Sequence, residues 1–537
     1  MLTNQFPGVH VKEIPSGARP IASISTSNTV FIDTFQRGPV NEAVRLTSWA
    51  DFQRIFGGLW KESEASYGVL QYFQNGGSVA FVVRTPFVNT GGGALPAGVN
   101  KFQEATVTLK AGADDALTAK AVNGGSWGNA IHLGVVHHAT DAKLYTLLVR
   151  EYKGDKVVAE EIYQDLSTDK DADRFPEKVI DGTSAMITAT GVDTKRPALT
   201  DAAVTTLDAL KEQAKSKFTP LATGGDGFVL SSTGFETRAR DAILGDAAAR
   251  TGIYALENIV PDIFNIMCIP VAGLLGETPA KMVYEAAEKF CRDRFAFLIV
   301  DPGKGIAHNK IYSDWFSKMG GAVSRNAAGY FPRLDIVDTA DGDKQRSLAP
   351  SGMVAGMMAR IDSSRGVWKT TAGTETRYSG GPPEYKLTDL EQEPLNRLGV
   401  NAIRSFPVYG NIIWGGRTLV GADALADEYK YAAVRRTALF IQQSLQRGLK
   451  WTVFEGNDED LWGQIRLNVG AFMQSLHRQG AFQGKAASDA YLVKCDGDTT
   501  KQADIDLGIV NILVAFAPLK PAEFVVLNFQ QLTKLPE

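Results

Sequence analysis

The sequence is poor in the residues and runs that mark metal sites, redox sites and membrane spans. Its 537 residues include three cysteines and six histidines, and no two cysteines form a CxxC pair. It contains no run of 18 or more apolar residues, the usual sign of a membrane-spanning helix. Isolated cysteines in apolar surroundings are usually buried free thiols, which is our prediction for Cys268, Cys291 and Cys495. We therefore expect no metal, no cofactor and no direct membrane insertion.

The chain also lacks an excess of charge of one sign. It has 56 basic and 60 acidic residues, a formal net charge of -4, so no overall field attracts nucleic acid or an anionic membrane. We expect no nucleic acid partner. The N-terminal residues lack a basic stretch followed by an apolar one, which a secretory signal requires. We therefore expect synthesis and folding in a cytosol.

No catalytic motif is complete in this sequence. The glycine-rich stretch 223–228, TGGDGF, differs from the phosphate-binding GxxxxGK[ST] pattern, and 338–345, DTADGDKQ, lacks the spacing of a calcium loop. There is no GxSxG motif. Adjacent His137 and His138 point to opposite faces of a predicted strand and cannot readily share a metal. The acidic residues 458–460 most simply complement the positive end of a helix, so we predict no catalytic residue.

Hydrophobic patterns predict a β-α-β unit near the N-terminus. Apolar strands are expected at 27–35 and 78–85, on either side of a capped helix in TSWADFQRIFGG. Before them, a short alternating strand at 9–14 lies between Pro7 and Pro15, which prevent it from pairing locally. The length of the chain predicts two to four domains.

The middle of the chain is expected to hold an insertion followed by a second α/β region. A Gly/Pro-rich stretch at 89–101 marks a boundary, and strand-like runs after it predict an antiparallel insertion up to about residue 225. Apolar strands at 264–271 and 295–301 then flank a helical stretch. This is the pattern of a parallel β-α-β crossover.

Two helices and three strands are predicted between residue 432 and residue 529. The first helix should end at Gly448 and the second should run from Asn457, as its N-cap, to Gly480. Helical spacing places eight apolar residues on inward faces: Val434, Ala438, Ile441 and Leu445 on the first helix, and Leu461, Ile465, Phe472 and Leu476 on the second. Two strands follow. A last strand, at 523–529, has no later segment with which to pair.

A local basic face is predicted at the first of these helices. It comprises Arg435, Arg436, Arg447 and Lys450, the last lying just beyond the helix end. Charged helix faces are often only solvated, and an acidic protein partner is the main alternative. Nucleic acid is disfavoured because the neighbouring residues offer no stacking array.

Several long motifs follow one another along the chain. They are FPGVHVKEIPSGARPI, FIDTFQRGPVNEAVRLTSWADFQRIFGG, GSWGN, LAPSGMVAGMMARIDSSRGVWKT, GVNAIRSFPVYGNIIWGGRTL, KYAAVRRTALFIQQSLQRGLKWTVFEGNDEDLW and ADIDLGIVNILVAFAPLKPAEFVVL. In this order they resemble the contractile tail sheath proteins of myophages, R-type pyocins and related contractile injection systems. The likeness covers residues 1–85 and about 225–535. The insertion matches poorly apart from SWGN, and Thr437 and Ala438 stand where relatives have bulkier apolar residues.

The resemblance implies a structural subunit without an active site. Sheath proteins polymerise as stacked hexameric rings in a helix around an inner tube, and their contraction drives the tube through a target cell envelope. The implied partners are further copies of the chain, the inner tube protein, and baseplate and tail terminator or cap proteins. The implied location is a phage tail or contractile injection particle, assembled in the bacterial cytoplasm.

The resemblance also implies a multidomain α+β fold with extended arms. The expected parts are an N-terminal arm (1–20), an inner α/β domain built from both chain ends (21–90 and 390–518), a β-rich outer insertion (91–225), a middle α/β domain (226–389) and a C-terminal strand or arm (519–537).

Two kinds of contact follow from the resemblance. Strand exchange between subunits would use Val9, His10, Val11, Lys12, Glu13, Ile14, Glu523, Phe524, Val525, Val526, Leu527 and Phe529. Contact with the inner tube would use the basic face, because the inner domain of such proteins touches the tube. The predicted tube contacts are Arg435, Arg436, Arg447 and Lys450. Whether the last strand is donated to a neighbour or receives a neighbour's arm stays open.

Two other classes of protein stay open as well. An α/β enzyme is suggested only by the crossover at 264–301, and a fold does not imply an activity. Another self-assembling shell or surface-layer protein would also suit a large acidic chain with apolar terminal strands. Such a protein would form sheets or closed shells, whereas a sheath forms cylinders of uniform width.

Overall fold

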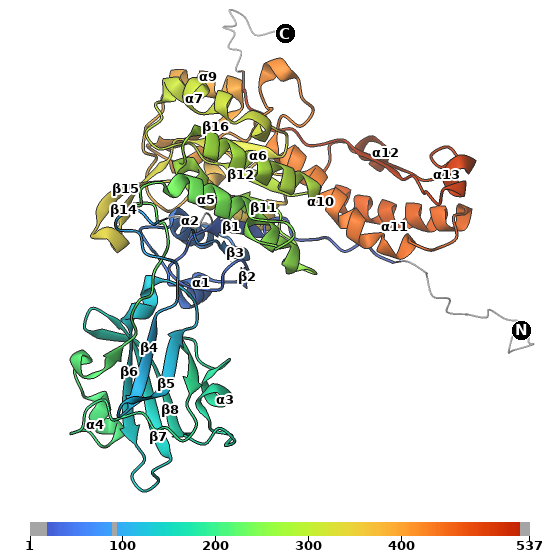
Figure 1. The fold of residues 1–537 in the computed structure, drawn as a ribbon. Coiled ribbons are helices and arrows are strands. Elements are labelled where there is room, and N and C mark those ends of the chain that lie inside the picture. The colour runs from blue at the N-terminus through green and yellow to red at the C-terminus, as the bar shows by residue number, and fades with distance from the viewer. Residues whose placement is uncertain (1–18, 89–93, 527–537) are drawn as a thin grey trace, which may run out of the picture.

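One sheet of eight strands forms the body of the molecule, whose computed structural model describes residues 19–88 and 94–526 (Figure 1). The strands are β1 (Thr29–Asp33), β2 (Ala43–Leu46), β3 (Ala80–Arg84), β11 (Ile266–Cys268), β12 (Phe297–Val300), β13 (Ala327–Phe331), β16 (Val400–Phe406) and β17 (Gly410–Trp414). They lie in the order β17-β16-β13-β12-β11-β1-β3-β2. Pairing is parallel from β16 to β3, and only the edge strands β17 and β2 pair antiparallel.

Helices cover both faces of this sheet, as its near-continuous apolar strands require. In β1, Val30 and Ile32 join an apolar cluster with residues of α5 (Phe235–Leu244) and α6 (Glu277–Asp293). Phe31, between them, joins a second cluster on the opposite face with residues of α1 (Trp49–Phe56), α2 (Glu64–Gln74) and α8 (Ser351–Arg365). The body is therefore a three-layer structure of helices, sheet and helices.

Helices α2 and α8 cross at backbone contact distance, which glycine makes possible. A Cβ atom added at Gly352 would lie 2.2 Å from the carbonyl oxygen of Gly68, and one added at Gly356 would lie 2.5 Å from that of Tyr72. Real Cβ atoms do not approach a backbone oxygen so closely. The motif LAPSGMVAGMMAR thus places glycines where the two helices meet.

The predicted β-α-β units are confirmed, but the predicted division of the body is not. β1 and β3 pair in parallel, and Ser48 caps α1 by accepting a hydrogen bond from the Asp51 amide. β11, α6 and β12 form the parallel crossover expected at 264–301. However, β1 also pairs directly with β11, so residues 21–90 and 226–389 share one sheet. The boundary between an inner and a middle domain therefore does not coincide with a break in this sheet.

The residues between β3 and α5 form two antiparallel sheets of their own, at the bottom of Figure 1. One sheet contains β4 (Thr106–Ala111), β5 (Asp114–Ala121) and β9 (Ile187–Gly191), and the other contains β6 (Ile131–His137), β7 (Leu144–Lys153), β8 (Lys156–Ser167) and β10 (Thr219–Pro220). Leu117 of β5, Leu133 of β6 and Leu147 of β7 share one apolar cluster. The two sheets therefore pack face to face, with α3 (Pro176–Ile180) and α4 (Leu207–Lys211) beside them.

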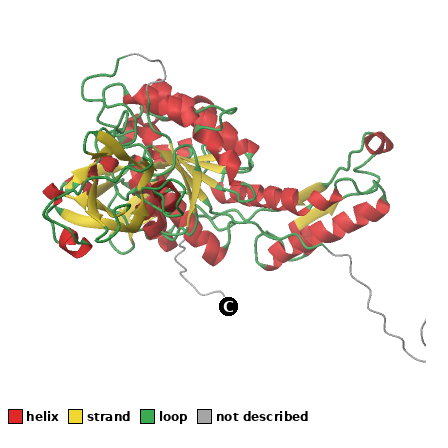
Figure 2. Ribbon diagram, turned by 60° about the horizontal axis from the view of Figure 1, so that its bottom comes forward, coloured by secondary structure: helices red, strands yellow, loops and turns green. Residues whose placement is uncertain are grey.

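Residues 432–516 build a helical lobe that extends to one side of the body (Figures 1 and 2). It contains α10 (Ala432–Gly448), α11 (Glu459–Arg478), α12 (Ala487–Ala490), β18 (Tyr491–Lys494), α13 (Gln502–Asp506) and β19 (Leu513–Phe516). The remaining elements, α7 (Ile311–Asp314), the hairpin of β14 (Leu334–Asp338) and β15 (Lys344–Leu348), and α9 (Asp389–Leu398), belong to the body. All three cysteines are buried free thiols, as predicted.

Candidate inter-subunit interface

The two long helices of the lobe pack as the sequence predicts. Val434, Ala438 and Ile441 of α10 are buried, and Leu445 is half-buried. All four inward residues predicted for α11 are buried too. The predicted N-cap is wrong by one residue, because the Asp458 carboxylate accepts the hydrogen bond from the Leu461 amide. Asn457 instead accepts one from the Trp462 indole nitrogen.

A small antiparallel hairpin, β18 with β19, lies on these helices with an apolar outer face. Its register opposes Tyr491 to Phe516 and Val493 to Val514, and these four side chains pack on the cluster that contains the core of α11. The intervening Leu492 and Leu513 point the other way and keep 52% and 49% of their surface exposed. One face of the hairpin thus packs on the lobe, and the other face is apolar and exposed in the single chain.

The outer edge of β19 is open for pairing. The Ala517 amide donates to the Ala490 carbonyl at 2.8 Å, so in this register the backbone groups of Val514 and Phe516 point away from β18. On the opposite edge, the Tyr491 amide donates to a carbonyl of α12, and the Cys495 carbonyl accepts from Arg466. Within the described ranges, no backbone hydrogen bond is recorded outward from Val514 or Phe516. A free edge of this kind is a ready template for another strand.

The described chain begins beside this lobe, on contacts that hold its first residues. The Arg19 amide donates to the Asn468 side-chain oxygen of α11 at 3.1 Å, and the Arg19 guanidinium lies 4.6 Å from the ring centroid of Trp451. Ile21 is buried against Gly448, where an added Cβ atom would clash with it. The N-terminal segment therefore leaves from a fixed position on α10 and α11.

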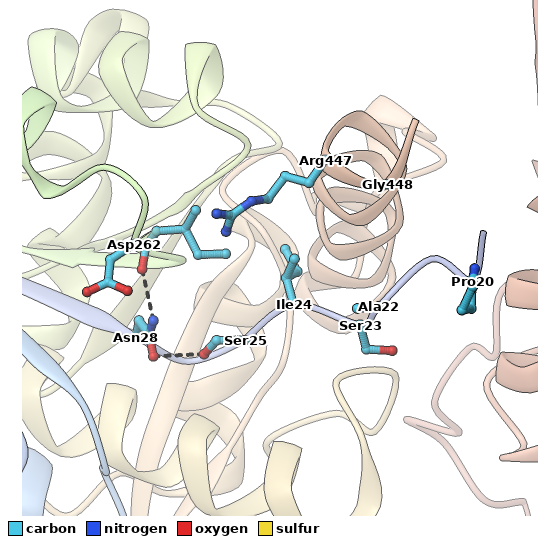
Figure 3. A pocket seen from close by; sticks show the side chains of 10 residues that line it. Pro20, Ala22, Ser23, Ile24, Ser25, Asn28, Asp262, Arg447 and Gly448 are labelled. Atoms are coloured by element: carbon cyan, nitrogen blue, oxygen red, sulfur yellow. Dashed lines mark hydrogen bonds between the residues drawn. The ribbon is translucent and has the colours of Figure 1, made fainter. Parts of the chain in front are cut away.

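An open cavity of about 460 Å³ lies where this segment passes into β1 (Figure 3). The Asn28 amide group donates to the Ile263 carbonyl at 2.9 Å and accepts from the Ser25 hydroxyl at 2.8 Å. The lining residues are Pro20, Ala22, Ser23, Ile24, Ser25, Asn28, Asp262, Ile263, Arg447 and Gly448. The cavity thus lies between residues 20–28 and the loop that precedes β11.

The predicted basic face does not exist as one exposed surface. Arg436 is only 4% exposed; its guanidinium pairs with the buried Asp362 carboxylate at 2.6 and 3.0 Å and donates to the Thr26 carbonyl at 3.0 Å. The assignment of Arg436 to the inner tube is therefore corrected. Its position on α10 turns it toward α8 and the N-terminal segment, where it joins three parts of the chain.

The other three basic residues differ in their exposure. Arg435 is half-buried and donates to the Asn326 side-chain oxygen at 2.7 Å. Arg447, also half-buried, donates to the Pro261 carbonyl at 2.5 Å. Lys450 is exposed. Of these four residues, Lys450 alone has the surface exposure that the prediction needed, and within the described ranges it forms no ion pair.

The predicted strand-exchange residues fall mostly outside the described part of the chain. Val9, His10, Val11, Lys12, Glu13 and Ile14 lie before it, and Leu527 and Phe529 lie after it. Phe524, Val525 and Val526 are exposed and form no strand in the single chain. Glu523 differs from its neighbours, because its carboxylate binds the Arg417 guanidinium of its own chain. Strand exchange itself stays a prediction.

Two buried residues of this region were missed by the sequence analysis. Arg417 is fully buried at the Glu523 contact, and Asp362 is the partner of Arg436. Asp362 stands two residues after Arg360 in GMMARIDSS and gives no such sign, whereas Arg417 is a lone charge in the apolar and glycine-rich IIWGGRTLV. That signal marks a buried ion pair, although it does not identify the partner.

Two buried carboxylates elsewhere are explained by helix ends. Burial raises the pKa of Asp33 and of Asp301 to about 7, against hydrogen bonds that lower it. Asp33 accepts from the Ala65 amide in the first turn of α2, and Asp301 accepts from the Ser351 amide in the first turn of α8, each at 2.9 Å. Each carboxylate therefore complements the positive end of a helix.

The described ranges contain neither a metal-binding cluster nor a membrane-spanning helix. Within residues 19–88 and 94–526, no three His, Cys, Asp or Glu side chains come together so as to hold a metal ion. Across the same residues, every helix is too short or too polar to span a bilayer.

Similarity to known proteins points to one family. Residues 426–531 match the phage tail sheath C-terminal domain. The tail sheath protein of Burkholderia phage BcepMu is 27% identical over 159 residues, which are 29% of this chain and 33% of that protein. The alignment thus spans a third of the length of that relative.

Solved structures share the fold over nearly the whole chain. The PVC sheath complex of an extracellular contractile injection system, in its contracted state, matches with a TM-score of 0.55 at 20% identity and covers 99% of both chains. The contracted helical sheath of the anti-feeding prophage matches with 0.55 at 20% identity, over 98% of this chain and 99% of that one. A sheath tail protein of Listeria innocua matches with 0.58 at 15% identity, over 93% and 96%. Together these matches confirm that the chain resembles contractile tail sheath proteins, with a phage tail sheath C-terminal domain at residues 426–531.

Proposed function

We propose that this protein is the structural subunit of a contractile sheath. Subunits would stack as hexameric rings in a helix around an inner tube, and contraction of the helix would drive the tube through a target cell envelope. Its partners would be further copies of itself, the tube protein, and the baseplate and terminator or cap proteins of the particle. Support comes from the fold, which resembles subunits of contracted sheaths along almost the whole chain.

The observation that carries the proposal is the open edge of β19 beside an anchored chain end. A contractile helix needs links between subunits that persist while whole subunits rotate and slide. Adding a neighbour's arm to the β18–β19 hairpin would provide such a link, because strand addition relies on backbone hydrogen bonds. Each of these contributes about 0.5–1.5 kcal/mol net, so four bonds along β19 would contribute about 2–6 kcal/mol.

The apolar side chains of the hairpin would add to this link. Leu492 and Leu513 present an uncovered apolar face, which an added strand with alternating apolar residues would extend. The strand at 9–14 has that alternation, with Val9 and Val11 against His10 and Lys12. We therefore assign the N-terminal arm of a neighbouring subunit to this hairpin and leave the second arm, beyond Glu523, to another contact between subunits.

The rest of the chain would serve as rigid bodies joined to these links. Pro15 and Pro20, and Pro518 and Pro521, border the two arms and restrict their backbone beside the body. The β-rich insertion (91–225) would form the outer surface of the sheath, and the helical lobe would lie toward the tube. No step of this mechanism requires an active site.

Electron microscopy of the full chain and of one substitution tests the proposal. The full chain should form hollow cylinders of uniform width, and flat sheets or closed shells would contradict a sheath. Val514→Pro removes an outward-pointing amide of β19 and keeps an apolar side chain on the lobe, so the hairpin should keep its internal bonds. We expect folded Val514→Pro subunits that form no cylinders.

Val514→Thr is the matched control, because it keeps the backbone N–H and the β-branched shape. It should form cylinders like the full chain. Deletion of residues 1–18 should abolish cylinders in the same way as Val514→Pro. Normal cylinders from Val514→Pro would exclude the β19 edge as the acceptor, and normal cylinders from the deletion would exclude the N-terminal arm as the donor.

A further inference from the structure

Arg417 is a buried cation fixed to the eight-stranded sheet near its β17 edge. It follows β17, and none of its side chain is exposed. Its amide donates to the Asn401 side-chain oxygen at 2.7 Å, and the Asn401 side-chain nitrogen donates back to the Arg417 carbonyl at 2.8 Å. The same nitrogen donates to the Gly329 carbonyl at 3.1 Å. Arg417 is thus tied to β16 and β13.

The guanidinium of Arg417 has two nitrogens that bind a carboxylate. Nη1 donates to the carbonyls of Asn396 and Gly421, at 3.0 and 3.1 Å. This leaves Nε and Nη2, which donate to Oε1 and Oε2 of Glu523 at 2.8 and 2.5 Å. Two parallel bonds from one guanidinium to one carboxylate are the strongest and most directional form of this contact.

Other groups complete the surroundings of Glu523. The Lys430 ammonium lies 3.6 Å from Oε2, and the Tyr431 hydroxyl donates to Oε2 at 3.3 Å. Burial alone would raise the pKa of Glu523, but the bonds and charge of Arg417, followed by Lys430, lower it below its ordinary value. The site therefore holds Glu523 as a carboxylate.

The exposure of the chain changes abruptly after this contact. The Glu523 side chain is 17% exposed, whereas Phe524, Val525 and Val526 are 74%, 80% and 79% exposed. Without Glu523, the nearest carboxylate to the buried Arg417 would be that of Asp423, at 3.3 Å and itself 58% exposed. A buried guanidinium with so weak a partner is unfavourable.

We propose that Arg417, with Lys430 and Tyr431, is a binding site for the Glu523 carboxylate that anchors the C-terminal arm to its own subunit. The arm that can leave the subunit then begins at Phe524. Where the proposed sheath function holds, tension on that arm passes through Glu523 and Arg417 to β16 and β13, and so to the whole sheet. Glu523 accordingly stays bound to its own subunit and is not exchanged with a neighbour.

Limited chymotrypsin digestion of the full chain tests this anchor without requiring assembly or contraction. Cleavage after Phe524 needs the flanking residues to detach from the body and extend in the protease. Glu523→Gln keeps the size of the side chain but removes its charge. We expect it to accelerate cleavage after Phe524 at least tenfold, measured as the appearance of the 525–537 fragment by mass spectrometry.

Two references make the outcome decisive. Asp423→Asn removes a carboxylate from the same site that does not belong to the arm, so its cleavage after Phe524 should stay within twofold of the unchanged chain. Phe454 is fully exposed in the folded protein, so its cleavage rate should be the same in all three proteins. The proposal is overturned if Glu523→Gln is cleaved at the unchanged rate, if Asp423→Asn accelerates cleavage equally, or if cleavage after Phe454 accelerates in parallel. The digestion is done on unassembled subunits, in which no neighbour covers Phe524, so none of these results depends on whether the protein forms cylinders.

Discussion

The buried pair of Arg436 and Asp362 offers the sharpest test of how the helical lobe is held to the body. Asp362→Asn keeps the size of the side chain and removes its charge. Both side chains are nearly inaccessible, at 4% and 2% exposed, so the Arg436 guanidinium would remain buried without a counter-charge.

The expected magnitude follows from the geometry. At an N···O separation of about 3 Å and an effective dielectric constant of about 20, the attraction between the two charges is about 5–6 kcal/mol. Part of this is offset by the loss of hydration of both groups, and removing one partner of a buried pair destabilises a protein by about 3–5 kcal/mol. The Asn amide oxygen can still accept one bond from Arg436. We therefore expect a loss of about 3 kcal/mol in the free energy of unfolding.

Urea unfolding monitored by tryptophan fluorescence measures this loss, because Trp368, Trp451 and Trp462 lie in or against the core of the lobe. Glu393→Gln is the control. It breaks a surface pair with Arg397, in which the side chains are 55% and 73% exposed, and such pairs contribute under about 1 kcal/mol.

A further variant separates charge from packing. Replacing both partners by apolar residues, Asp362→Leu with Arg436→Met, leaves no buried charge and should recover most of the lost stability. A loss under about 1 kcal/mol for Asp362→Asn would refute the reasoning.

Two more predictions concern the pH dependence of stability and the inner tube. Because burial raises the pKa of Asp301 from 3.8 to about 7, the folded state keeps this proton to higher pH than the unfolded chain does. The stability that Asp301 contributes is therefore complete below pH 4 and is lost as the pH rises to about 7. Asp301→Asn should give a smaller fall in stability between pH 4.5 and 7.5, by urea unfolding at both values; an unchanged fall would show that Asp301 does not titrate there. For the tube, Lys450→Glu should give sheaths without tubes when the tube protein is co-expressed, whereas Lys156→Glu, on β8 of the insertion, should leave tube content unchanged. Equal tube content in both variants would remove Lys450 from that contact.

Local sequence patterns were sufficient to predict helices, strands and caps, because the interactions that determine these elements join residues close together in the chain. The inward faces of α10 and α11 follow from helical spacing, because residues three and four apart share one side of a helix. Strands β1, β3, β11 and β12 follow from short apolar runs, and a parallel crossover follows from the helix between two of them. Capping was predicted to within one residue, since Asn457 and Asp458 are both good caps.

For charged residues, local patterns did not predict which side chains are buried or which residues they pair with. On α10, Arg435 and Arg436 are neighbours and look alike in the sequence. Arg436 turns inward because its partner Asp362 lies 74 residues earlier in the chain. Glu523 likewise looks like an ordinary strand residue until the fold brings Arg417, 106 residues away, beside it. The spacing of residues along the chain cannot indicate an ion-pair partner that lies so far away in the sequence.

The sequence by itself determined the order of the elements, their inward faces and the resemblance to sheath proteins. These depend on spacing and motif, which are local properties of the chain. Only the tertiary structure decided that strands from residues 29–84 and 266–414 form one sheet, that β19 keeps an open outer edge within the described residues, and that Arg436 and Arg417 bind the Thr26 carbonyl and the Glu523 carboxylate. Each of these depends on which distant segments meet, and that is settled by the joint burial of apolar surface and by the pairing of charges that burial leaves without water.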